Sequence, residues 1–175
     1  MDAAITELLT PLTESRRAHS IAVGRRMESV AHLLPEELRQ EAITAAYLHD
    51  VGYGHPETRF HPIDGANLLQ SLGYSSVVCH VVAFHSASVI EADVRGFDLG
   101  VFDRFKVVDV PGIDMVDAFM WWADMTTGPN GETFTVDERL DEILRRYEPG
   151  SIVHTAISRA APLIRSVVQR ASGSM

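Results

Sequence analysis

The adjacent pair His49-Asp50 offers an imidazole and a carboxylate at the point where a helical pattern ends. Both groups are good ligands for a divalent transition ion, and the end of a helix allows two neighbouring side chains to reach one point beyond it. Two ligands alone would hold an ion poorly, so further ligands must come from other segments. The candidates are three histidines and one aspartate from distant parts of the chain: His19, His61, His85 and Asp124.

Helical spacing predicts that these candidates face the protein interior. Residues three and four positions earlier share a helix face with a given residue, and they are apolar before His49, His85 and Asp124 alike. A carboxylate buried without a partner is costly, and a metal ion or an arginine removes that cost. Because a single histidine on an apolar face is more often a core residue than a ligand, the prediction depends on the whole ordered set. The remaining histidines do not fit this pattern and are assigned ordinary structural roles: His32, His55, His80 and His154.

The elements that position the ligands are predicted to be helices over nearly the whole chain. Apolar residues at helical spacing, with Gly and Pro at the boundaries, predict helices over 14–34, 35–50, 61–73, 75–87, 113–126, 135–147 and 151–170. Thr135 and Glu138 have the spacing of a capping box, and Pro162 is expected to kink or restart the last helix. The segment 113–126 is apolar on nearly every side, which is typical of a central helix. Residues 171–175 are expected to fray.

The segment Glu91–Gly112 mixes glycines, a proline and three phenylalanines and follows no regular pattern. Two interpretations stay open: a lid over the site, or a surface excursion packed by its own aromatic side chains. Residues Val107–Val110 could form a short strand.

Length and composition indicate a single domain over residues 1–175, and the helical pattern predicts that it is all-α. A chain of 175 residues with 46% apolar and 22% charged residues is typical of one globular domain. We expect a bundle of about six to eight helices, with a metal-site core over 15–131 and C-terminal helices over 135–170. The single cysteine, Cys79, excludes an internal disulfide and a thiolate cluster, so nitrogen and oxygen ligands must bind the metal.

Charge and hydropathy restrict the partners. A net charge of −9 argues against a polymeric nucleic acid, because such binding depends on basic side chains that neutralise phosphates. The apolar runs look too short for the roughly 20 residues of a membrane-spanning helix, and the first residues lack a secretory layout, so a cytoplasmic location is expected. A small substrate is therefore the expected partner. The oligomeric state does not follow from the sequence.

These motifs together resemble the HD superfamily of metal-dependent phosphohydrolases, from about Ser15 to Gly131. The matching elements are Arg16-Arg17-Ala18-His19-Ser20, His49-Asp50-Val51-Gly52-Tyr53, Phe60-His61-Pro62-Ile63-Asp64-Gly65-Ala66, Val82-Ala83-Phe84-His85-Ser86 and Ala123-Asp124-Met125-Thr126-Thr127-Gly128-Pro129. The resemblance implies a first metal site made by His19, His49, Asp50 and Asp124. For the superfamily's dinuclear members it implies that His61 and His85 bind a second ion, with Asp50 as the bridge.

The activity that the resemblance implies is hydrolysis of a small phosphate ester or nucleotide with one or two divalent ions of Fe, Mn, Zn, Co or Ni. A bound metal lowers the pKa of its water to about 7, and the resulting hydroxide attacks phosphorus. Asp50 is expected to be catalytic. Arg16, one turn before His19, and Arg26, two turns after it, are candidates to bind the phosphate, although both could be surface charges. Asp64 is expected to orient a ligand or activate water, or alternatively to support the start of its helix.

Two departures prevent the assignment of a particular substrate. Some members of the superfamily have two successive histidines where this chain has Phe84-His85, and some nucleotidases have a glutamate where it has Val51-Gly52-Tyr53. Two other functional classes stay open. One is a di-iron oxygenase, because related oxygenases use an equivalent set of four histidines and two aspartates. The other is a regulatory module that binds a nucleotide without turnover.

Overall fold

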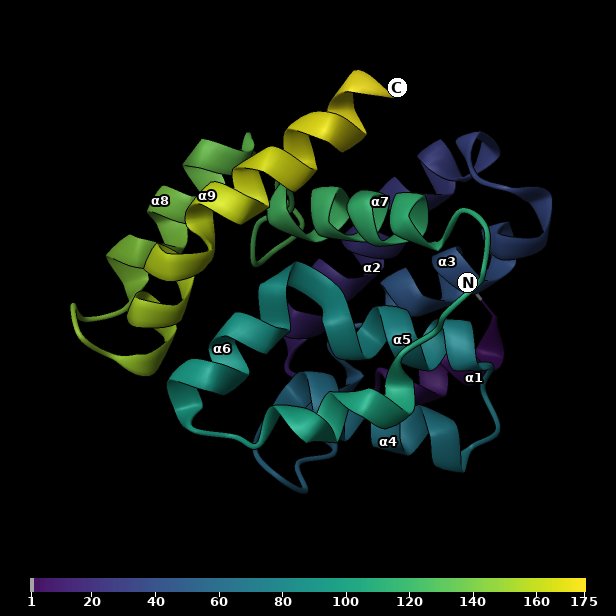
Figure 1. The fold of residues 1–175 in the computed structure, drawn as a ribbon, viewed down its shortest axis with the longest axis horizontal. Helices are drawn as coiled ribbons and strands as arrows, with labels where there is room; N and C mark the ends of the chain where they lie inside the picture. Colours follow the sequence, from purple (N-terminus) through teal and green to yellow (C-terminus); the bar gives the residue numbers. More distant parts are fainter. Residues whose placement is uncertain (1) are drawn as a thin grey trace.

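The computed structural model describes residues 2–175, and its regular structure is helical (Figure 1). The α-helices are α1 (Ala3–Leu8), α2 (Glu14–Val30), α3 (Glu36–Leu48), α4 (His61–Ser71), α5 (Ser76–Phe84), α6 (Ser88–Arg95), α7 (Ile113–Met125), α8 (Val136–Arg146) and α9 (Ile152–Gly173). Short 3₁₀ segments follow at Ala31–Leu33, Val51–Gly54, His85–Ala87 and Leu99–Phe105. The all-α class is confirmed. Residues 2–175 contain nine α-helices rather than six to eight, because α1 and α6 were not predicted.

The helices α2 and α3 position the first ligands, His19 within α2 and the pair His49-Asp50 at the end of α3. Thr13 caps α2 by accepting a hydrogen bond from the backbone N–H of Arg16. Pro35 is the residue before α3 rather than its first helical residue, and two glutamates follow at the positive end of the helix dipole. The helix α3 ends at Leu48, so the pair His49-Asp50 lies at its C-terminal end, before the 3₁₀ turn. The predicted single helix over 14–34 changes to a 3₁₀ turn at Ala31.

The main apolar core lies among α2, α3, α4, α5 and α7, and buried residues such as Met27, Leu48, Val82 and Phe119 contribute to it. The helix α7 was predicted to be covered on every side. This is correct for its later turns, where Phe119, Met120 and Ala123 are buried, but its first turn exposes Asp114 and Met115. In Figure 1, α9 crosses α7, and the two helices pack directly on each other.

A second apolar cluster joins α8 and α9 to the end of α7 through Met125, Leu140, Ile143 and Ile164. The capping box that begins α8 is confirmed, with Thr135 and Glu138 bonded reciprocally. The helix α9 runs through Pro162 without a restart and continues to Gly173. The predicted fraying from residue 171 is therefore wrong, because apolar packing of the buried Ala171 holds the last turn.

The segment after residue 90 is more regular than predicted. It completes α6 and then forms the 3₁₀ segment Leu99–Phe105, in which Phe102 and Phe105 are each 2% exposed. Phe97 packs against Phe60 with ring centroids 5.1 Å apart. The predicted strand at Val107–Val110 is wrong, since the described residues pair as β structure only at an isolated bridge between Thr127 and Thr133. These contacts favour the packed excursion over the lid.

A left-handed turn separates α5 from α6, with φ angles of 47° at Ser86 and 62° at Ala87. By length and composition alone, the residues Ser76–Arg95 could cross a membrane, which differs from the expectation from the apolar runs. However, 61% of the most apolar window is buried inside the domain, and the turn interrupts the helix. The core helix of a globular protein passes the same test, so this segment is weak evidence for a membrane span.

Candidate metal centre

The six candidate ligands come from five helices. His19 lies on α2, the pair His49-Asp50 follows α3, and His61 begins α4; His85 follows α5, and Asp124 lies in the last turn of α7. All six are buried except His61, which is half-buried.

Gly52 explains how the pair at the end of α3 comes so close to α4. A Cβ atom at Gly52 would lie 2.1 Å from the carbonyl oxygen of His61 and 2.6 Å from the backbone nitrogen of Gly65. Backbone meets backbone at this point, so any side chain larger than hydrogen would push the two segments apart. The close approach sets Asp50 beside His61.

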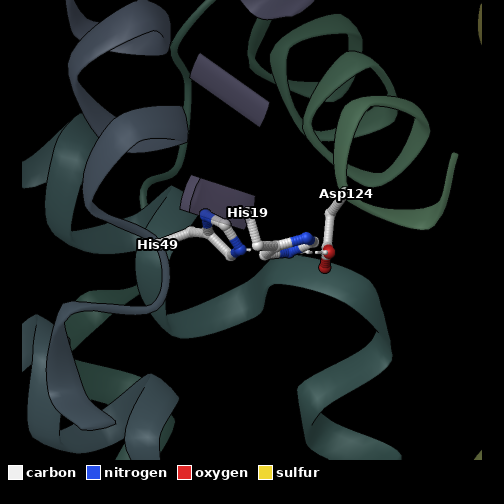
Figure 2. Close-up of side chains that lie close together, drawn as sticks. All are labelled: His19, His49 and Asp124. Carbon is white, nitrogen blue, oxygen red and sulfur yellow. Dashed lines mark hydrogen bonds and ion pairs between the residues drawn. The ribbon is translucent and has the colours of Figure 1, made fainter. Parts of the chain in front are cut away.

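The first group of ligand atoms belongs to His19, His49 and Asp124, and these atoms all lie within 4.8 Å of one another. Figure 2 shows the three side chains converging from three different helices. The Nε2 atom of His19 lies 3.1 Å from Oδ1 of Asp124, and that of His49 lies 3.9 Å from the same oxygen.

Backbone carbonyls orient both imidazoles of the first group. Nδ1 of His19 donates to the carbonyl of Gly128, and Nδ1 of His49 donates to that of Ala46, each at 2.9 Å. Because a carbonyl can only accept, these contacts place a proton on Nδ1 of each ring and leave Nε2 as the atom that faces the shared point. Histidines that ligate metals are typically held in this way.

The second group consists of Asp50, His61 and His85, whose ligand atoms also lie within 4.8 Å of one another. Nε2 of His61 lies 3.4 Å from Oδ1 of Asp50 and 3.2 Å from Nε2 of His85. Nδ1 of His85 donates to the carbonyl of Val82 at 2.6 Å. The other carboxylate oxygen of Asp50, Oδ2, lies 3.6 Å from Nε2 of His49. Asp50 therefore presents one oxygen to each group.

The residues present fit one or two metal ions. Nε2 of His49 is buried and has no hydrogen-bond partner, which costs about 1–3 kcal/mol unless something else binds it. Four imidazoles and two carboxylates form a nitrogen and oxygen donor set that suits Zn, Fe, Mn, Co and Ni. The geometry leaves open whether one ion or two are bound.

The pKa values of most of these groups favour the protonation state that binds a metal ion. Burial lowers the pKa of His49 to about 4, against the opposing effect of Asp50 and Asp124, and burial also lowers the pKa of His61 well below its usual range. Burial alone would raise the pKa of Asp50, but the charges of His49, Arg16 and His61 hold it well below its usual range. Neutral imidazole and ionised carboxylate are the forms that bind metal.

His19 and Asp124 form a coupled pair. Burial would lower the pKa of His19, but its hydrogen bond with Asp124 and the charges of Asp124 and Asp50 raise it. Burial would raise the pKa of Asp124, yet the hydrogen bond from His19 and the charge of His49 hold it well below the usual range. A cation between these side chains would replace the proton that they share.

Ser86 is a functional candidate that the sequence analysis did not single out. Its Oγ donates to Oδ2 of Asp124, the oxygen that does not face His19. Its backbone is in the left-handed region, which costs energy for a residue with a side chain. The turn after His85 thus directs the hydroxyl onto a candidate ligand. The only sequence signal was its place in the motif next to His85.

Arg16 lies at the candidate site. Its Nη1 donates to Oδ2 of Asp50 at 2.8 Å, and its guanidinium lies 4.2 Å from the centroid of the Tyr53 ring. Tyr53 in turn stacks on His61, with ring centroids 4.0 Å apart. Arg16 and Tyr53 both line the cavity beside the candidate metal ligands.

The structure places Arg26 and Asp64 away from that cavity. Arg26 donates to Thr126 at 2.7 Å and lies over the ring of Trp122, where it lines a separate surface hollow. Asp64 accepts hydrogen bonds from the N–H and hydroxyl of Thr58, at 2.8 and 2.7 Å, so it holds the loop before α4. For Asp64 this position favours the alternative that it supports the helix start.

The cavity at the candidate ligands is small, about 100 Å³. Asp50, His61, His85 and Asp124 line one side of it together with Arg16. The helix α8 and the turn after it contribute further lining residues, Arg139, Arg146 and Tyr147. Sequence reasoning missed these residues, because basic residues spaced along an amphipathic helix look like an ordinary solvated face.

A family model described as the HD domain matches residues 16–108, which is just over half of the chain. The match covers five of the six candidate ligands and ends before Asp124, which the fold brings to the same place. No curated protein and no solved structure shows a significant match to the sequence. The matched region and the helical fold agree, and the chain belongs to the HD domain family.

Proposed function

We propose that this protein is a phosphohydrolase that uses one or two divalent transition-metal ions to hydrolyse a small phosphate ester or nucleotide. The observation that supports the proposal is that two groups of candidate ligands meet at Asp50, which presents one oxygen to each group. They lie beside a cavity that the guanidinium of Arg16 also lines.

Each candidate residue would have a separate role. His19, His49 and Asp124 would hold one ion, and His61 and His85 would hold a second, with an oxygen of Asp50 on each side. Bound ions supply charge that polarises a phosphoryl oxygen and makes water more acidic. Arg16 would bind the phosphoryl oxygens, because its planar guanidinium donates two parallel hydrogen bonds to such groups. Its contact with the Tyr53 ring holds it at the cavity.

The size and position of the cavity support a small substrate. A space of about 100 Å³ between the ligands and α8 accommodates a phosphate and a short attached group far better than a polymer. The negative net charge of the protein supports the same choice.

Metal analysis of the protein purified without added metal, together with a hydrolysis screen over nucleotides and phosphate esters, tests the proposal. We expect one or two transition ions per chain and turnover of at least one phosphate ester. The double variant His49→Ala/Asp50→Ala should lose both, whereas His32→Ala, which changes an exposed histidine, should keep both. Unchanged metal content in the double variant would refute the assignment, and tight nucleotide binding without turnover would indicate a regulatory module.

The composition of the ligand set favours a second candidate, a di-iron oxygenase. Four imidazoles and two carboxylates that offer one oxygen to each group also suit a pair of irons. Consumption of dioxygen by a protein that contains two irons, without release of phosphate, would favour this candidate. Hydrolysis of a phosphate ester under anaerobic conditions would exclude it as the main activity.

A further inference from the structure

The part of the cavity lining that α8 supplies contains two guanidiniums, and one carboxylate on the same helix accepts hydrogen bonds from both. Arg139 and Arg146 lie on α8, and both line the cavity. Nη1 of Arg139 and Nη2 of Arg146 both donate to the same oxygen, Oε2, of Glu142. One carboxylate thus balances two positive charges, and one positive charge is left over.

Arg139 is poorly satisfied for a buried cation. It is 6% exposed, and its Nε is buried without a hydrogen-bond partner. A buried charge is costly unless it is paired and its donors are used. Arg145 and Arg146, by comparison, are exposed to solvent, so Arg139 is the arginine of this helix that the fold holds inside.

The other carboxylates of the cavity do not supply the missing charge. Glu91 pairs with Arg95 at 2.6 Å, on α6. Asp50 pairs with Arg16 at 2.8 Å, and Asp124 accepts from His19 and Ser86. Arg139 therefore lines the cavity as a cation with an unused donor and without a carboxylate of its own.

We propose that Arg139, together with Arg146, binds a second oxyanion of the substrate, a carboxylate or a phosphate, where α8 lines the cavity. This inference rests on the proposed function, because it assigns the substrate to the class of phosphate esters that carry another anionic group. Arg16 and the metal ligands would bind the phosphate that is cleaved. Glu142 would hold the two guanidiniums in place and would compete with the incoming anion.

Binding of unreactive probes tests the anion site without any need for turnover. The probes are alkyl phosphonates of one to four methylene groups that end in a carboxylate, in a second phosphonate or in a neutral carboxamide. Calorimetry with the metal-loaded protein should show that at least one anionic chain binds about 10-fold or more tightly than the carboxamide of the same length. The arm that binds best identifies the oxyanion as a carboxylate or a phosphate.

Three variants on α8 should respectively weaken, strengthen and leave unchanged the binding of the anionic chain. Arg139→Gln should remove the preference for the anionic chain and leave the affinity for the carboxamide unchanged. Glu142→Gln should raise the affinity for the anionic chain, because it removes the competing carboxylate. Arg145→Gln makes the same change of charge on an exposed part of the helix and should change nothing. A thermal melt checks that each variant folds. If Arg139→Gln does not fold, Arg139→Lys replaces it, because lysine keeps the charge but lacks the planar guanidinium.

The results separate the two proposals. An equal affinity of the wild-type protein for anionic and neutral chains, or an unchanged preference in Arg139→Gln, would overturn the second anion site while hydrolysis of phosphate esters remained. Binding through Arg139 in a protein that hydrolyses no phosphate ester would instead refute the proposed function and leave the anion site standing.

Discussion

The two ligand groups differ in how completely the protein assembles them. His19, His49 and Asp124 are at most 8% exposed, and the first and last of them are already joined by a hydrogen bond. The whole group of Asp50, His61 and His85 lines the cavity, where Arg16 contacts Asp50 and Tyr53 stacks on His61, whereas only Asp124 of the first group lines it. The difference suggests that the first group binds its ion tightly and that the second exchanges its ion and meets the substrate.

Replacement of Asp50 by alanine should have the largest effect, because this side chain faces both groups. We expect loss of both ions and a fall in hydrolysis on the order of 10³-fold. Metal analysis and steady-state kinetics measure the two effects. Asp137→Ala, at an exposed residue that pairs with Arg165, is the matched control. Retention of two ions per chain would show that the groups do not share Asp50.

Replacement of His61 by alanine should separate the two groups. Only the second ion should be lost, with one ion per chain retained and hydrolysis reduced on the order of 10²-fold. His49→Ala, in contrast, should release the first ion because it removes a fully buried donor. Metal content after dialysis distinguishes the two variants. Identical losses in both would show that the groups are one cooperative site.

Replacement of Ser86 by alanine should have a smaller effect that is confined to the first group. The variant loses the hydrogen bond to Asp124, and such a supporting contact is typically worth 10–100-fold in metal affinity. A competitive chelator measures that affinity. Ser29→Ala, which removes an exposed hydroxyl, should leave it unchanged. An unaltered affinity in Ser86→Ala would mean that Asp124 needs no support from this turn.

The smallest expected effect is on the pH dependence of stability in the metal-free protein. His49 and His19 should contribute to it in opposite directions. The pKa of His49 is lowered to about 4, so the unfolded chain takes up its proton first and stability falls as the pH drops from about 6.5 to 4. The pKa of His19 is raised, so its contribution is present at low pH and is lost as the pH rises.

Urea titrations at several pH values measure these contributions, each below about 1.4 kcal/mol per pH unit. His49→Asn should flatten the loss of stability on acidification, and His19→Asn should steepen it. His32→Asn, at an exposed position, is the control. A steeper loss in His49→Asn would contradict the burial of a neutral imidazole.

The sequence predicted the helices and the six inward-facing candidates because both follow from local periodicity. The seven predicted segments became α2, α3, α4, α5, α7, α8 and α9 with small shifts at their ends, and the family match confirms the resemblance. That the six side chains act as metal ligands stays a prediction.

The missed features depend on tertiary contacts. Arg26 and Arg16 look equivalent along α2, yet only the face of Arg16 meets the cavity, while Arg26 lies over Trp122. The wall formed by Arg139 and the turn at Ser86 depend on how α8 and α5 pack, which periodicity does not encode. The strand predicted at Val107–Val110 failed because β-branched residues can equally follow a 3₁₀ segment.

The contact at Gly52 has a consequence for the choice of metal. The backbone of the turn after Asp50 is in close contact with the backbone at the start of α4. The distance between the backbones of Asp50 and His61 is therefore nearly fixed. A larger ion cannot be accommodated by moving these two backbone segments apart. Accommodation of a larger ion would instead depend on rotation of the side chains of Asp50, His61 and His85, so a change of metal should alter these side chains before it alters the fold.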